Sequence, residues 1–94
     1  YVMRFNIEAC PQKFIDIAKA LGATNVTPEG AVEAVIDLSK ALQIPSLRSY
    51  KVEDKDLARL AKDALGRNSN CVTNPRTMNE KDAIDVYRKA LEEE

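Results

Sequence analysis

Apolar residues recur at helical spacing in four stretches of the chain, and short polar breaks separate these stretches. In the first stretch, residues 11–21, the apolar positions follow the i, i+3, i+4, i+7 pattern of one helix face. They are Phe14, Ile17, Ala18 and Leu21. Pro11 suits the first helical position, where its missing N–H has no intrahelical partner, and Gly22 suits the residue just after the end. The pattern predicts a helix over 11–21.

The second stretch has the clearest beginning. Thr27 is a favoured N-cap residue, and Pro28 follows it at the first helical position. Val32 and Ile36 lie beside the main apolar stripe, so this helix is expected to be buried on more than one side. The helix is predicted to end at 43–45, because the residue before Pro45 avoids the helical region. The main stripe is made of Ala31, Ala34, Val35, Leu38 and Leu42.

Residues 46–52 are interpreted as a connection to a third helix. Asp54 is a plausible N-cap for this helix, and Gly66 is expected to close it. The apolar stripe between these two residues has helical spacing. It consists of Leu57, Leu60, Ala61, Ala64 and Leu65.

A polar, irregular segment at 67–78 precedes the last predicted helix. Asn79 opens that helix, and Asp82 three residues later completes a pattern like a capping box. Three acidic residues at 92–94 oppose the helix dipole, so this end is expected to fray as a solvated tail. The apolar face of the helix consists of Ala83, Ile84, Tyr87, Ala90 and Leu91.

The opening residues allow two interpretations. Alternation of apolar and polar residues over 1–8 is typical of a strand, but the same residues fit the tail of a helix. No second strand candidate is present for pairing, and an isolated strand is not stable, which favours the helix tail. The predicted fold class is therefore all-α. We expect a small bundle of four main helices plus an N-terminal helix tail, as a fragment of a larger helical domain.

Composition narrows the classes of function. The 94 residues include 14 basic and 15 acidic side chains of mixed order, a net charge of −1, with no basic footprint for nucleic acid. No apolar run is long enough for a membrane span, and no signal-peptide pattern is present. Two cysteines do not form a disulfide framework, which favours a reducing, cytoplasmic setting.

Candidate chemical groups are few, because the chain contains no histidine, the commonest metal ligand and general base. Cys10 precedes a predicted helix, but a small, partly buried residue explains it better than a reactive thiol. Glu53, Asp54 and Asp56 lack the glycine turn of a cation loop and fit helix-start acids instead. Cys71 lies in the polar loop at 70–76. From these residues alone, the chain is a helical bundle without catalytic machinery.

Several short motifs, in this order along the chain, resemble the last part of the iron-containing (group III) alcohol dehydrogenases. The resemblance covers essentially all of the chain, and the Asn-Pro-Arg loop together with the opening motif carries most of it. The motifs are Val-Met-Arg-Phe-Asn at 2–6, Pro-Gln-Lys-Phe at 11–14, Ile-Ala at 17–18, Leu-Gly at 21–22, Ile-Pro at 44–45, Leu-Arg at 47–48, Val52, Asp-Leu at 56–57, Leu-Ala at 60–61, Asp-Ala-Leu at 63–65, Cys71, Asn-Pro-Arg at 74–76, and Ile84, Tyr87 and Ala90.

The resemblance implies that residues 1–94 are the C-terminal segment of a dehydrogenase-like helical domain. In that family an α/β domain binds NAD or NADP, and the helical domain holds iron, sometimes zinc, through one aspartate and three histidines. Those ligands lie upstream of the matched segment, so no catalytic, cofactor-binding or metal residue is expected here. The parent would interconvert primary alcohols and aldehydes, and this segment alone would be inactive.

The resemblance further implies that Cys71 lines the substrate pocket, where it contributes shape and polarity. The expected partner is the remainder of the parent enzyme, meaning the upstream helices and the nucleotide-binding domain. Self-association is also expected, since Val32 and Ile36 leave apolar surface without those helices. An alternative is a stand-alone helical protein-interaction module. A reading frame that extends upstream and carries the metal ligands would favour the enzyme.

Overall fold

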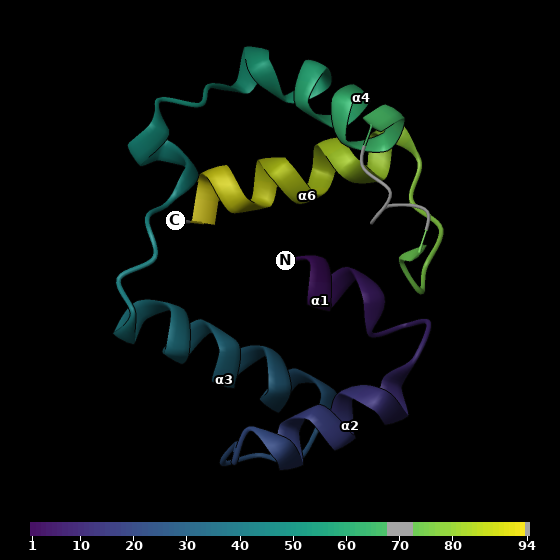
Figure 1. The fold of residues 1–94 in the computed structure, drawn as a ribbon, viewed down its shortest axis with the longest axis vertical. Helices are drawn as coiled ribbons and strands as arrows, with labels where there is room; N and C mark the ends of the chain where they lie inside the picture. Colours follow the sequence, from purple (N-terminus) through teal and green to yellow (C-terminus); the bar gives the residue numbers. More distant parts are fainter. Residues whose placement is uncertain (68–72, 94) are drawn as a thin grey trace. The chain divides into compact units, whose positions relative to one another are not determined.

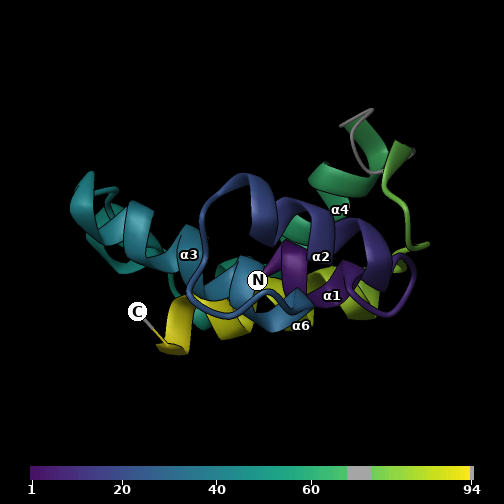
Figure 2. The ribbon, with the colours of Figure 1, turned by 90° about the horizontal axis from the view of Figure 1, so that it is seen from below.

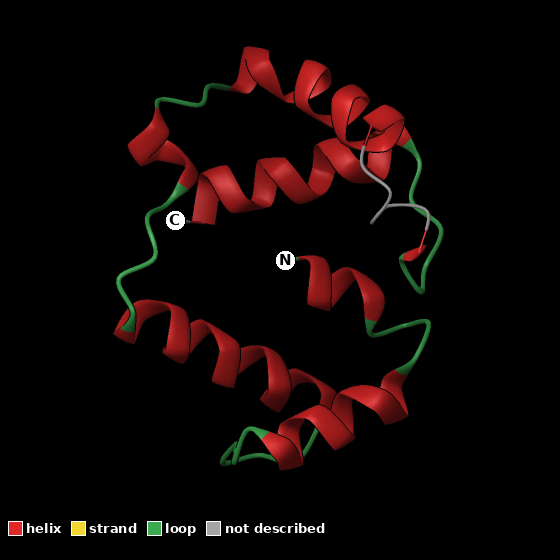
Figure 3. Ribbon diagram, in the orientation of Figure 1, coloured by secondary structure: helices red, strands yellow, loops and turns green. Residues whose placement is uncertain are grey.

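The computed structural model describes residues 1–67 and 73–93, and every regular element within them is a helix (Figure 3). The chain divides into two compact units. The N-terminal unit is Val2–Ile44, and the C-terminal unit is Pro45–Glu94 together with Tyr1. The predicted all-α class is confirmed. Among the described residues, no helix is long and apolar enough to cross a membrane.

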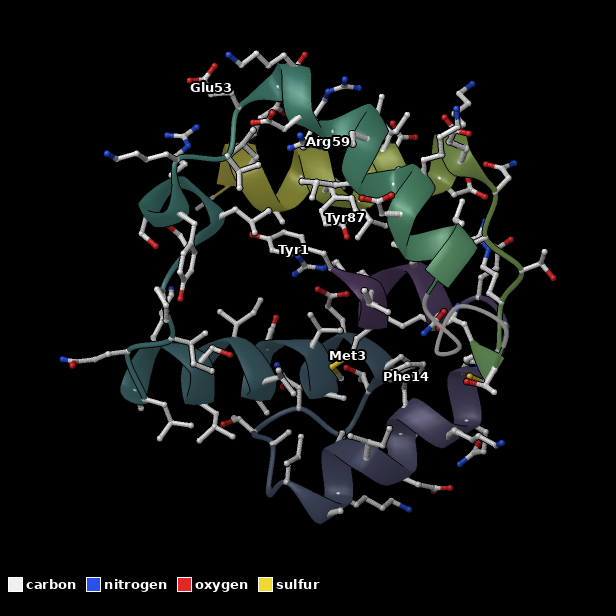
Figure 4. All side chains as sticks on the ribbon, turned by 45° about the horizontal axis from the view of Figure 1, so that its top comes forward. Tyr1, Met3, Phe14, Glu53, Arg59 and Tyr87 are labelled. Atoms are coloured by element: carbon white, nitrogen blue, oxygen red, sulfur yellow. The ribbon has the colours of Figure 1, made fainter. Side chains whose placement is uncertain are left out.

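The N-terminal unit contains α1 (Val2–Asn6), α2 (Pro11–Ala20) and α3 (Pro28–Ala41) (Figure 1). The opening segment is thus a helix, as expected, and not a strand. Its Met3 side chain packs against a small core, and Figure 4 shows it beside Phe14. The buried members of that core are Phe14, Ala18 and Ala31, with Met3, Ile7, Cys10 and Ala23 packed around them.

Gly22 ends α2 in the way that its position predicted. Its φ of 69° is left-handed, a conformation that glycine adopts without steric cost. The N–H of Gly22 donates to Lys19 O (3.1 Å) and that of Ala23 donates to Ala18 O (3.0 Å), which is a Schellman motif. The helix itself stops at Ala20, one residue earlier than predicted.

The start of α3 also follows the prediction. Thr27 Oγ1 accepts a hydrogen bond from the Gly30 N–H at 3.0 Å, and Pro28 occupies the first turn. The guanidinium of Arg4 forms an ion pair with Glu29 at 2.6 Å, which ties α1 to this first turn. Both side chains are about half exposed, so the pair contributes little to stability.

The end of α3 is made by Gln43, not by the proline two residues later. Gln43 has a φ of 57°, a left-handed conformation that costs a residue with a Cβ. Its N–H donates to Lys40 O (3.1 Å), and the Ile44 N–H donates to Ser39 O (3.1 Å). The expected boundary was therefore nearly right, but the cause is a second Schellman motif with glutamine in the place of glycine.

Replacing Gln43 with glycine is expected to stabilise the chain by about 1 kcal/mol, because glycine removes the left-handed strain. Chemical denaturation followed by circular dichroism measures the change. Gln43→Ala is the matched control, since alanine keeps the Cβ and should bring no such gain. Equal stability of the glycine and alanine variants would contradict this account of the helix end.

Only the first turns of α3 are buried on more than one side. Ala31 and Val32 are 0% and 3% exposed, whereas Ile36 is half-buried. Leu38 and Leu42, on the main predicted stripe, are 50% and 64% exposed. The expected multi-sided burial therefore holds at the beginning of α3 and is wrong at its end, where the helix runs on beyond α2 (Figures 1 and 2).

The C-terminal unit packs α4 (Leu57–Arg67) against α6 (Glu80–Glu93) (Figure 1). Leu57 and Ala61 of α4 are 1% and 0% exposed, and Ala83 of α6 is 4% exposed. These positions belong to the predicted apolar stripes. The remaining stripe residues of the two helices are half-buried: Leu60, Ala64, Leu65, Ile84, Tyr87, Ala90 and Leu91.

Two details of this unit differ from the prediction. The N-cap is Glu53 rather than Asp54, because a 3₁₀ turn, η2 (Asp54–Asp56), leads directly into α4. Gly66 lies inside the last turn of α4 and does not close it. The connection at 46–52 contains another 3₁₀ turn, η1 (Leu47–Tyr50), with Ser46 at its N-cap.

Candidate functional site

The loop before α6 contains the Asn-Pro-Arg motif and is held by one of its own side chains. Asn74 Nδ2 donates to the carbonyl oxygen of Arg76 at 2.7 Å, across the intervening Pro75. The side chains of Asn74 and Arg76 are both half-buried. An amide that bonds the backbone two residues on restricts the turn, so this hydrogen bond helps to fix the path of the chain at Pro75.

The entry of this loop into α6 is fixed by a reciprocal cap. The Asn79 N–H donates to Asp82 Oδ2 at 3.2 Å, and the Asp82 N–H donates to Asn79 Oδ1 at 2.8 Å. The predicted capping box is confirmed, with aspartate in the place of the usual glutamate. The loop and the helix are therefore joined rigidly at the first turn of α6.

The structure tests the prediction for one of the two cysteines and not for the other. Cys71, the predicted substrate-pocket residue, lies outside the described residues, so its role stays a prediction. Cys10 is a half-buried free thiol at the N-cap of α2, and its Sγ lies 3.7 Å from Asn6 O. This is the small, partly buried residue at a helix start that the sequence favoured.

The acidic cluster at the start of α4 is accounted for by local partners. Asp56 Oδ2 accepts from the Glu53 N–H at 3.0 Å, and Asp54 pairs with Arg88 of α6 at 3.2 Å. The Glu53 carboxylate in turn lies 3.4 Å from the Lys55 ammonium. The cluster is thus a set of helix-start acids with amide and cationic partners.

A metal site does not fit the described residues. No group of three or more His, Cys, Asp or Glu side chains gathers anywhere in 1–67 and 73–93. The whole sequence contains no histidine. A divalent transition metal needs several nitrogen, sulfur or carboxylate donors at one point, and this part of the chain does not assemble them.

Arg48 is a structurally important residue whose role the sequence did not reveal. Its Nε donates to Leu91 O at 2.7 Å, and its Nη2 lies 3.5 Å from Glu92 O. A guanidinium at a helix C-terminus satisfies carbonyls that have no intrahelical partner and favours the dipole. The end of α6 therefore has a cationic cap from η1.

Replacing Arg48 with methionine is expected to lower stability by about 0.5–1 kcal/mol, since the group is exposed and partly screened. The loss should be local, with faster amide hydrogen exchange in the last turn of α6. Arg59→Met is the control, because it removes the same charge from an exposed side chain of α4 that pairs with Asp56 of η2 at 3.5 Å. Faster exchange in the control to the same extent would argue against a cap.

Together, the fold and the loop define a class of protein. Within residues 1–67 and 73–93, the chain is a helical segment that fixes the loop before α6 and gathers no set of metal ligands. Residues 1–91 match the family described as Fe-containing alcohol dehydrogenase family, C-terminal. The chain therefore belongs to the iron-containing alcohol dehydrogenase family, as the sequence resemblance implied.

Relatives with assigned activities agree with this membership. The chain is 36% identical over 98 residues to a 1,3-propanediol dehydrogenase of Citrobacter freundii, covering 97% of this chain and 25% of the relative. It is 34% identical over 96 residues to a choline dehydrogenase of Bacillus subtilis (96% and 24%). It is 33% identical over 98 residues to a lactaldehyde reductase of Escherichia coli (96% and 25%). The chain thus spans about a quarter of the length of these curated relatives.

Proposed function

We propose that this chain is the C-terminal helical part of an NAD- or NADP-dependent dehydrogenase that interconverts primary alcohols and aldehydes. The observation that carries the proposal is the match of residues 1–91 to the C-terminal part of the iron-containing family. The names of two relatives, 1,3-propanediol dehydrogenase and lactaldehyde reductase, indicate an alcohol and an aldehyde as substrates of those proteins.

Within such an enzyme, this segment has a supporting role. The described residues do not fit a metal, so we assign iron or zinc and the nicotinamide cofactor to other parts of the enzyme. The contribution of this chain is to hold the loop at 74–79, through the Asn74 bond and the Asn79–Asp82 cap, as one wall of the cleft. Cys71, just before that loop, is proposed to line the substrate pocket.

The test is to express the complete reading frame that encodes this chain, alongside the 94-residue chain alone. The full product is expected to oxidise NADH or NADPH with short aldehydes, and the 94-residue chain is expected to be inactive. A truncated product that lacks residues 1–94 should also be inactive. A reading frame that begins at Tyr1, or a folded full product without activity on aldehydes or primary alcohols, would refute the proposal.

We further propose that the remainder of the enzyme is the partner of this chain, in the cytoplasm, and that the isolated chain self-associates. The cysteine usage supports the compartment. Val32 no longer supports self-association, because it is buried within the N-terminal unit, but Leu38 and Leu42 are exposed. Sedimentation of the 94-residue chain at low and high concentration should show a rising average mass. A constant monomer mass would contradict self-association.

A further inference from the structure

One face of α3 is buried at the beginning of the helix and exposed to solvent at its end. Leu38 and Leu42 follow Ala31 by seven and eleven residues, about two and three helical turns, so the three side chains share a face. Ala31 is 0% exposed, whereas Leu38 and Leu42 are 50% and 64% exposed. Ile44, just beyond the helix, is 62% exposed and extends the apolar surface. We call Leu38, Leu42 and Ile44 the distal α3 face.

The lengths of the helices explain why this face is bare within the N-terminal unit. With 10 and 14 residues, α2 and α3 are about 15 Å and about 21 Å long. Figures 1 and 2 show that α2 crosses the beginning of α3 and leaves its end free of α2. The apolar stripe of α3, which α2 covers at Ala31, therefore continues beyond the part of α3 that α2 contacts.

From this we infer that the distal α3 face is the docking surface for the part of the enzyme that precedes this chain. The inference rests on the proposed function. The expected occupant of the distal α3 face is an apolar helix face, which would cover the end of α3 as α2 covers its beginning. Because the three side chains are uncharged and adjacent, the complementary surface is apolar. The length of the relatives supports this choice of occupant, because about three quarters of their chain lies outside the matched part and could supply such a helix.

The test places a charge on this face and on a matched exposed position of the same unit. Leu42→Glu and Val26→Glu are made in the full product of the reading frame and in the 94-residue chain at low concentration. Val26 lies between α2 and α3 and is 47% exposed. In the full product, Leu42→Glu should lower Tm by about 5 °C or more, because a charge is buried without a partner. Val26→Glu should leave Tm nearly unchanged, and neither variant should alter the Tm of the 94-residue chain.

Every other outcome overturns the inference in a recognisable way. An active full product in which Leu42→Glu is as stable as Val26→Glu rejects the docking surface and leaves the proposed function standing. If Leu42→Glu destabilises the 94-residue chain as much as the full product, the chain covers this face itself. A fall in native mass of the full Leu42→Glu product means that a second copy covers it. An inactive wild-type full product rejects the proposed function together with the inference.

A milder substitution keeps the test usable if Leu42→Glu prevents folding of the full product. Leu42→Asn has nearly the same shape and adds an amide in place of two methyl groups. It should lower Tm in the full product and leave the 94-residue chain unchanged. The same Tm as the wild-type full product would overturn the docking surface.

Discussion

Replacing Gly30 with alanine should destabilise the N-terminal unit, although alanine is the better helix former. Helix propensity alone favours alanine by about 1 kcal/mol. However, a Cβ at position 30 would overlap the Asn25 carbonyl oxygen and lie 2.8 Å from its carbon. Both are backbone atoms, so overpacking of about 1–3 kcal/mol and weakening of the Thr27 cap by about 1 kcal/mol should dominate. The expected net loss is about 1–3 kcal/mol.

Chemical denaturation followed by circular dichroism measures this change, and the chain supplies its own matched control. Gly66 lies in the last turn of α4, and no atom of residues 1–67 and 73–93 comes within 4 Å of a Cβ built there. Gly66→Ala should therefore stabilise the chain by about 0.5–1 kcal/mol. The two identical substitutions thus have opposite predicted signs. A stabilising Gly30→Ala would mean that the Asn25 backbone does not approach α3 as described.

Truncating Leu57 to alanine should have the largest effect on the C-terminal unit. Leu57 is 1% exposed and is the largest side chain among the fully buried residues of the described part. Leucine-to-alanine substitutions in cores cost about 2–5 kcal/mol, through lost burial and the cavity left behind. A unit of this size has a net stability of similar magnitude, so the variant is expected to be largely unfolded at the start of α4.

Tyrosine fluorescence isolates the response of that unit. The three tyrosines of the chain, Tyr1, Tyr50 and Tyr87, are all assigned to the C-terminal unit. Leu42→Ala is the control, because Leu42 is 64% exposed and belongs to the other unit. It should cost less than about 1 kcal/mol, as is usual for exposed positions. Equal losses in both variants would show that Leu57 is not a core residue.

The sequence predicted most reliably those features that depend on a few neighbouring residues. Thr27 with Pro28, Asn79 with Asp82, and Gly22 act within one turn of their helices, and the structure has all of them as predicted. The four main helices and the helical opening segment were also predicted, because an apolar stripe is a repeated local signal.

Features that depend on tertiary contacts could not be predicted from the pattern. Arg48 bonds a carbonyl 43 residues away, and no local periodicity indicates such a pairing. Gln43 takes a left-handed conformation that usually indicates glycine. The sequence therefore predicted the helix end nearby, through Pro45, but not the Schellman motif that makes it. Of the candidate site, the structure describes the cap and the loop at 74–79, whereas the role of Cys71 rests on the resemblance alone.

Four of the seven buried apolar residues described in the chain are alanines: Ala18, Ala31, Ala61 and Ala83. An alanine side chain loses no rotamer entropy on burial, but it also removes little apolar area from water. The heat-capacity change of unfolding scales with that apolar area. Calorimetry of the isolated chain should therefore show a broad, shallow transition with a small step in baseline, unlike the sharp peak of a domain with a large aliphatic core.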